Sequence, residues 1–146
     1  VRVAAARAAV ARLCFHGVCP RRAAQRPSLL RAGAYVEYEG KLEASEREAL
    51  LPKLQAAMDE LIARAVPSTV QTVDATALGD YCSPNTIPSD PALWGKGWVR
   101  VVGVGGMVCP CGGTHVADTR ELGAVKVEAV KGKGKVTRIS YTVLDG

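Results

Sequence analysis

The sequence has no apolar run long enough to cross a membrane, because Arg, Gly or Pro interrupts each one well before the roughly 18 residues that a span needs. It also lacks the even set of cysteines typical of a secreted, disulfide-linked scaffold, since it holds five. Cys109 and Cys111 are instead separated by one residue and lie near His115. This arrangement favours reduced, metal-binding cysteine in an intracellular compartment, and we expect a cytoplasmic protein.

Acidic side chains are absent from residues 1–36, which hold seven Arg and no Lys. The rest of the chain carries 12 basic and 14 acidic residues, so the formal net charge of +5 is local rather than global. A second basic stretch occupies residues 126–146, with five bases against two acids. This distribution argues against a protein coated with positive charge for nucleic-acid binding.

The Ala/Arg-rich segment 1–33 differs in composition from residues 34–146, which we treat as one domain. Three interpretations of the segment stay open. It resembles a targeting segment, which would place the protein in a mitochondrion or plastid; it continues an opening helix of the same domain, if the chain is a fragment; or it is a spurious translation of GC-rich DNA. Its Cys14, His16 and Cys19 are potential ligands, although an incidental His beside buried thiols is the favoured interpretation.

An amphipathic helix follows a short strand at residues 34–40. Ser45 and Glu48 have the spacing of a capping box, which predicts the start of the helix. It should run to about Val66, kink or restart at Pro52, and end at Pro67. Its apolar residues recur at intervals of three to four and predict one buried face: Leu50, Leu51, Leu54, Met58, Leu61 and Ile62.

Four further strands are predicted, at residues 69–74, 98–104, 124–130 and 135–144. The last two should form an antiparallel hairpin, since a short Gly-containing link at 131–135 joins them. The expected fold is therefore α+β, with one long amphipathic helix packed on a mostly antiparallel sheet.

Residues 79–97 lack periodicity and hold three Pro, which predicts a surface loop. Trp94 and Trp98 are candidates for stacking on a nucleobase. Anchoring of the loop on the core is the preferred interpretation of the two rings.

The chemistry of the chain is concentrated in Cys109-Pro-Cys-Gly-Gly-Thr-His115. Cys111 and His115 are four residues apart, and one flexible turn can bring both onto one metal ion. Thiolate and imidazole are ligands that zinc prefers, although a catalytic site uses three protein ligands and a structural one four. Cys109 is a candidate third ligand, with a side chain expected to point away from Cys111. From spacing alone, a turn with a buried Cys and a surface His is an equally good interpretation.

A wider pattern resembles the editing domain of alanyl- and threonyl-tRNA synthetases. It consists of Cys111-Gly-Gly-Thr-His-Val116, then Thr119, Glu121-Leu-Gly123 and a Val-rich strand, and it extends back through residues 34–40. The similarity covers roughly residues 34–144 and is greatest to the stand-alone alanyl-tRNA editing proteins. It implies a barrel-like fold of helix and sheet, and hydrolysis of wrongly charged tRNA. It also implies zinc bound by Cys111 and His115 together with two His from a His-x-x-x-His helix.

The chain departs from that pattern because it holds only two histidines, His16 and His115, and no His-x-x-x-His. Either the pair lies upstream of Val1 in a longer parent protein, or the protein has lost half of the zinc site. We expect the intact protein to be an aminoacyl-tRNA deacylase. The alternative is a non-catalytic tRNA-binding or structural remnant of the same fold.

The resemblance also implies the substrate and the cofactor. The substrate would be the ester at the aminoacylated 3′ end of tRNA, and in particular of tRNA(Ala), with Zn²⁺ as cofactor. Thr114 is a candidate for positioning that substrate. Four basic side chains are candidates for phosphate contacts, although a solvated hairpin tip explains them equally well: Lys131, Lys133, Lys135 and Arg138.

Overall fold

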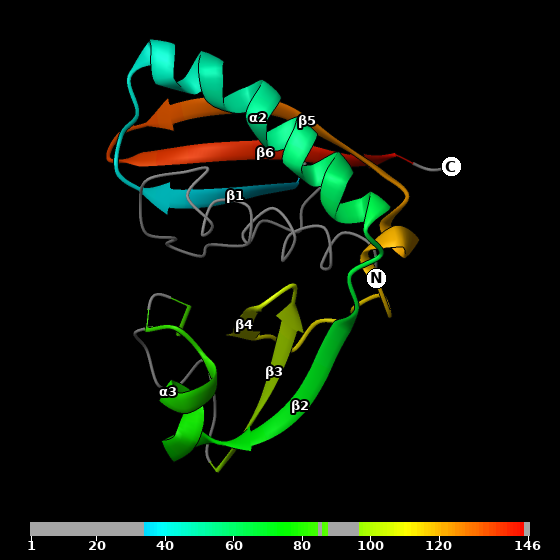
Figure 1. The fold of residues 1–146 in the computed structure, drawn as a ribbon. Coiled ribbons are helices and arrows are strands. Elements are labelled where there is room, and N and C mark those ends of the chain that lie inside the picture. The colour runs from blue at the N-terminus through cyan, green and yellow to red at the C-terminus, as the bar shows by residue number, and fades with distance from the viewer. Residues whose placement is uncertain (1–33, 85, 88–96, 145–146) are drawn as a thin grey trace.

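The strands of this protein divide into two antiparallel sheets of three strands each (Figure 1). The computed structural model describes residues 34–84, 86–87 and 97–144, so the segment 1–33 and Trp94 lie outside the described residues. The first sheet has the order β1-β6-β5 and the second β2-β3-β4. The bounds are β1 (Ala34–Glu39), α2 (Ala44–Ala63), β2 (Ser68–Asp74), α3 (Leu78–Tyr81), β3 (Trp98–Val104), β4 (Met107–Pro110), β5 (Ala124–Lys133) and β6 (Val136–Leu144). The predicted α+β class is confirmed.

The main core lies between α2 and the first sheet, across which the helix runs in Figure 1. The predicted apolar face of the helix is confirmed, because Leu54, Met58 and Leu61 are buried and Ile62 is partly buried against them. β6 contributes alternate residues, as its period of two predicts, and Ile139 and Tyr141 are fully buried. None of the helices described here is long and apolar enough to span a bilayer.

The start of α2 differs from the prediction. Glu43, not Ser45, is the N-cap, and the carboxylate of Glu46 accepts a hydrogen bond from the Glu43 amide at 2.8 Å. The capping box is therefore formed by Glu43 and Glu46, and Arg47 also donates to the Leu42 carbonyl at 2.8 Å just before the helix. The helix then passes Pro52 without a restart.

The end of α2 also differs, since the helix stops at Ala63 rather than near Val66. Ala65 takes a positive φ of 46°, which is unusual for a residue with a side chain. A distant threonine supports this turn. The buried hydroxyl of Thr119 donates to the Leu61 carbonyl at 2.6 Å and accepts from the Val66 amide at 2.8 Å. A tertiary contact, not Pro67, therefore ends the helix.

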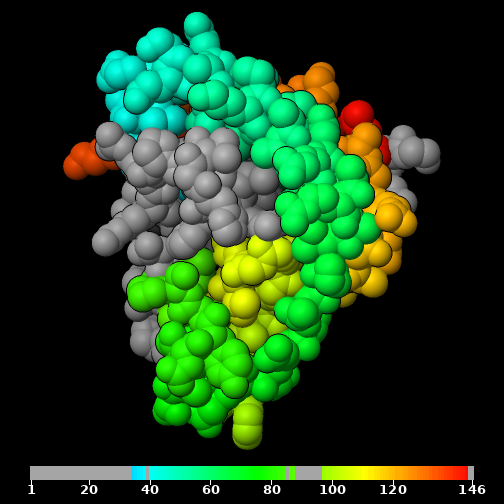
Figure 2. All heavy atoms as spheres, in the orientation of Figure 1, coloured from blue at the N-terminus to red at the C-terminus, as the bar shows by residue number. Residues whose placement is uncertain are grey.

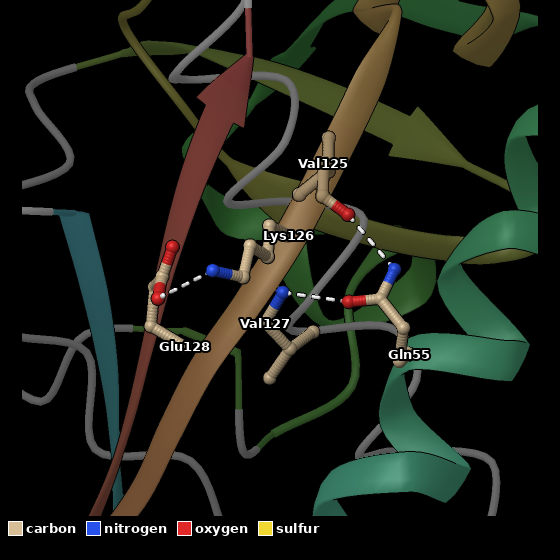
Figure 3. A network of polar contacts seen from close by, with 5 residues as sticks. All are labelled: Gln55, Val125, Lys126, Val127 and Glu128. Carbon is tan, nitrogen blue, oxygen red and sulfur yellow. Dashed lines mark hydrogen bonds and ion pairs between the residues drawn. The ribbon is translucent and has the colours of Figure 1, made fainter.

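The free edge of β5 is bonded to α2 through one side chain, as Figure 3 shows. The amide of Gln55 donates to the Val125 carbonyl at 3.0 Å and accepts from the Val127 amide at 2.8 Å. A primary amide matches the donor and acceptor spacing of a strand edge, so Gln55 takes the place of a neighbouring strand over these residues. On the same strand, Lys126 and Glu128 form an exposed ion pair at 3.4 Å.

The predicted hairpin of the last two strands is confirmed, but its link is shorter than residues 131–135. β5 continues to Lys133, which pairs with Val136, so that Gly134 and Lys135 alone form the turn. Gly134 has a φ of 60°, a left-handed value that such tight turns need and that glycine adopts without strain.

The second sheet contains an element that the sequence did not predict, the short strand β4, which pairs with β3. Thr69 of β2 pairs with Gly103 of β3, and the Thr69 hydroxyl occupies the space that a Cβ atom at position 103 would need. A smaller core packs against this sheet, from Val73, Leu78, Cys82, Val99 and Val101. The expected loop 79–97 begins with the end of α3, and Thr86 within it donates to the Val108 carbonyl at 3.2 Å.

The interpretation of Trp98 as a core anchor is wrong, because its side chain is 70% exposed. Trp98 is the first residue of β3, and Val99 and Val101 occupy the buried face of that strand. Strand alternation places Trp98 on the other face, together with Val102 and Val104, which are buried farther along the strand.

We expect Thr119→Val to lower the free energy of unfolding by about 2 kcal/mol, because it leaves the Leu61 carbonyl and the Val66 amide buried without this partner. Urea denaturation followed by circular dichroism measures the change. The control is Thr72→Val on an exposed position of β2, which should shift the midpoint little. Equal midpoints for the two variants would contradict the role given to Thr119.

Candidate metal centre

The chain reaches the candidate site through the β3–β4 hairpin. Val102 pairs with Cys109 and Val101 with Pro110. The Cys111 amide then donates to the Arg100 carbonyl at 3.0 Å, which continues the ladder for one residue beyond β4. Cys111 is therefore placed by the sheet, and the Gly-Gly-Thr-His turn begins directly after it.

Cys111 and His115 are brought together as the sequence predicts. Cys111 Sγ lies 3.2 Å from His115 Nε2, and zinc bond lengths require these two atoms to be about 3–4 Å apart. Without a metal ion this contact is a hydrogen bond, and the tautomer of the imidazole decides which atom donates. Cys111 is half-buried and packs against Val102 and Val104 of β3. The geometry agrees with a shared metal ion, and the metal itself stays a prediction.

Two more predicted residues lie near this pair in the sequence. Thr114 is exposed between the two candidate ligands, so its hydroxyl is available to a substrate. Cys109 is buried on β4. Over residues 34–84, 86–87 and 97–144, no group of three or more His, Cys, Asp or Glu side chains is arranged to hold a metal ion. Cys109 thus does not complete a three-ligand site with Cys111 and His115.

Arg100 holds the turn and was not singled out from the sequence. Its guanidinium donates to the Cys111 carbonyl at 2.5 Å and to the Gly113 carbonyl at 2.7 Å. A signal was available, because Arg100 is a single charged residue within the Val-rich strand that precedes the motif.

On the face drawn in Figure 2, yellow atoms of the β3–β4 region reach the surface beside the green atoms that follow α2.

The predicted phosphate-binding residues fall into two groups. Lys131, Lys133 and Lys135 are exposed around the tip of the β5–β6 hairpin. Arg138 is half-buried, forms an ion pair with Glu37 at 2.6 Å, and lies over the Tyr35 ring at 3.9 Å from its centroid. Its guanidinium thus joins β6 to β1, whereas the three lysines remain open to solvent.

A comparison with protein families finds one match in the same region. Residues 99–139 match the family of the threonyl and alanyl tRNA synthetase second additional domain. The match runs from β3 into β6 and contains Arg100, Cys111 and His115. It supports the resemblance seen in the sequence and associates this region with tRNA editing or binding in synthetases. No curated protein matches the chain.

We expect Cys111 to react with iodoacetamide before Cys82. Burial raises the pKa of the Cys82 thiol, so its reactive thiolate forms only at higher pH, and the side chain is 3% exposed. Cys111 is half-buried at the surface turn. Peptide-resolved mass spectrometry at neutral pH measures both labelling rates. Faster labelling of Cys82 at neutral pH would contradict the buried position of its side chain.

Proposed function

We propose that this protein hydrolyses mischarged aminoacyl-tRNA, and in particular mischarged tRNA(Ala), with the assistance of a zinc ion. The observation that carries the proposal is the 3.2 Å contact between Cys111 Sγ and His115 Nε2. It lies in the segment that matches the synthetase second additional domain. Exposed Thr114 adjoins the pair, so substrate and metal would share one surface.

The two side chains fit zinc in chemistry and in separation. Tetrahedral zinc bonds of about 2.3 Å to sulfur and about 2.0–2.1 Å to nitrogen place these ligands about 3.5 Å apart. The observed distance of 3.2 Å needs only a small adjustment. The described residues supply two ligands where a catalytic site uses three. In the resembled family two further histidines complete the set, and this chain holds His16 alone besides His115.

The chain's own residues would divide the work of ester hydrolysis. Cys111 and His115 would hold the ion, and the Thr114 hydroxyl would hydrogen-bond the aminoacylated end of the tRNA. Exposed Lys131, Lys133 and Lys135 would attract backbone phosphates without reading sequence. Zinc, when bound, polarises a carbonyl or lowers the pKa of a bound water to about 7. An aminoacyl ester is already activated, so little more is required.

One observation favours a second function of a different class. Because only two potential ligands meet in the described part of the chain, the domain would also serve as a tRNA-binding module without catalysis. Such a module keeps the turn and the lysines but needs no metal. Zinc content separates the two functions.

The test of the proposed function compares the chain with Cys111→Ala and with Cys82→Ala as a matched control. We expect the chain to retain Zn²⁺ weakly after desalting, since two protein ligands bind less tightly than three or four. Cys111→Ala should lose the zinc, and the control should retain it. Metal analysis and a chromophoric chelator measure both.

The same three proteins are then assayed for deacylation of mischarged tRNA(Ala). We expect slow hydrolysis by the chain and the control, and the uncatalysed rate for Cys111→Ala. Rapid deacylation that resists both Cys111→Ala and chelator would contradict a catalytic zinc ion. Zinc-free protein that binds tRNA without hydrolysis would instead support the binding module.

A separate prediction concerns tRNA binding and salt. Each lysine–phosphate contact contributes about 0.7–0.9 to the slope of log affinity against log salt concentration. Replacing Lys131, Lys133 and Lys135 with Gln should therefore lower that slope by about two to three, as measured by fluorescence anisotropy with labelled tRNA. Lys53→Gln on the exposed side of α2 is the control. An unchanged slope in the triple variant would exclude the hairpin tip from the binding surface.

A further inference from the structure

Arg100 contacts the Cys–His turn at three points. Its carbonyl accepts from the Cys111 amide at 3.0 Å, and its guanidinium donates to the carbonyls of Cys111 and Gly113 at 2.5 and 2.7 Å. Both guanidinium bonds come from Nη1, so one nitrogen bridges two peptide groups that lie two residues apart. The start of the turn is thereby closed onto the middle of β3.

The charge of Arg100 is used on main-chain carbonyls. Among the residues that the structure describes, its guanidinium forms no ion pair with a carboxylate, in contrast to Arg138 with Glu37 and Arg64 with Glu60. Among the described residues, the half-buried Arg100 guanidinium therefore bonds only to carbonyl groups of the turn, and its role is to stabilise that turn.

Within residues 34–84, 86–87 and 97–144, the start of the turn has few supports besides Arg100. β4 stops at Pro110, and a Cβ atom added to Gly112 would meet nothing within 4 Å. Cys111 contacts the core through Val102 and Val104, but Thr114 is exposed. Two adjacent glycines leave the backbone many alternatives, so an unheld turn would vary the separation of Cys111 Sγ and His115 Nε2. Ligand pairs must be held within about 0.5 Å to bind metal well.

We infer that Arg100 is a positioning residue for the Cys111–His115 pair, which it holds in metal-binding geometry through two main-chain carbonyls. The inference rests on the proposed function, since it concerns the same site. Arg100 touches neither metal nor substrate in this role. It acts as a support behind the ligands, where loss of a partner costs metal affinity by about 10–100-fold.

Cobalt(II) titration of the full chain tests the inference, because a thiolate bound to cobalt gives a charge-transfer band in the near ultraviolet. We expect Arg100→Met to bind Co²⁺ at least about tenfold more weakly than the unaltered chain. Arg100→Lys keeps the charge without the planar fork and should fall between them. Arg64→Met removes an exposed arginine from the end of α2 and should bind as the unaltered chain does.

A second measurement does not need the metal. In the metal-free protein the His115 ring resonances should shift or broaden in Arg100→Met, because the ring would no longer be held against Cys111 Sγ. Circular dichroism checks that the variant is folded. If Arg100→Met does not fold, Arg100→Lys replaces it in both measurements.

The outcomes separate this inference from the proposed function. Unchanged cobalt affinity and unchanged His115 resonances in folded Arg100 variants would overturn the inference while leaving the metal site intact. A missing charge-transfer band in the unaltered chain would overturn the metal site, and with it any role of Arg100 in metal binding. Weaker cobalt binding and altered His115 resonances in the Arg100 variants, with neither change in Arg64→Met, would support both the inference and the metal site.

Discussion

The arrangement of the two sheets depends on one buried hydroxyl. Thr119 bonds the Leu61 carbonyl and the Val66 amide at the point where α2 ends and the chain turns into the second sheet. Its own amide donates to the Val66 carbonyl at 2.9 Å, and the Ser68 amide donates to the Ala117 carbonyl at 2.8 Å. The chain passes between the two sheets at two places, from α2 to β2 and from the Cys111–His115 turn to β5. These hydrogen bonds therefore join the two connecting segments to each other. Because the group is buried, an unmade bond here would cost more than an average hydrogen bond contributes.

The candidate metal centre lies between β3 and the hydrogen bonds of Thr119. Arg100 holds the turn at Cys111 and Gly113, and Thr119 fixes the chain four residues after His115. Neither residue is a metal ligand. Weakly binding side chains gain most from such preorganisation, since any freedom that they lose on binding metal reduces affinity. The two-ligand site proposed for this chain thus relies on its supports more than a complete site would.

Local pattern predicted most of the elements, and long-range contacts explain what it did not predict. The buried face of α2, the β5–β6 hairpin and the alternation of β6 follow from periodicity, which does not depend on the partner. The predicted end of α2 was wrong because Thr119, more than 50 residues away in the sequence, determines where the helix stops. β4 was missed since four residues ending in Pro110 carry no period. Ligand type and spacing made Cys111 and His115 candidates, and the resemblance to the synthetase editing domain favoured them over a turn without metal. Arg100 was not, because its partners are backbone carbonyls, which every residue has.

The bonding of Gln55 to β5 has a consequence for how the hairpin docks. Its amide fits one carbonyl and one N–H on the same strand edge, those of Val125 and Val127. Sliding β5 by a single residue under the helix would present the opposite set of groups and turn both valines outward. The hydrogen bonds of one glutamine and the burial of two valines therefore both favour the correct docking of the strand over a shift by one residue. The same amide occupies the two edge groups that another chain would need to extend this sheet.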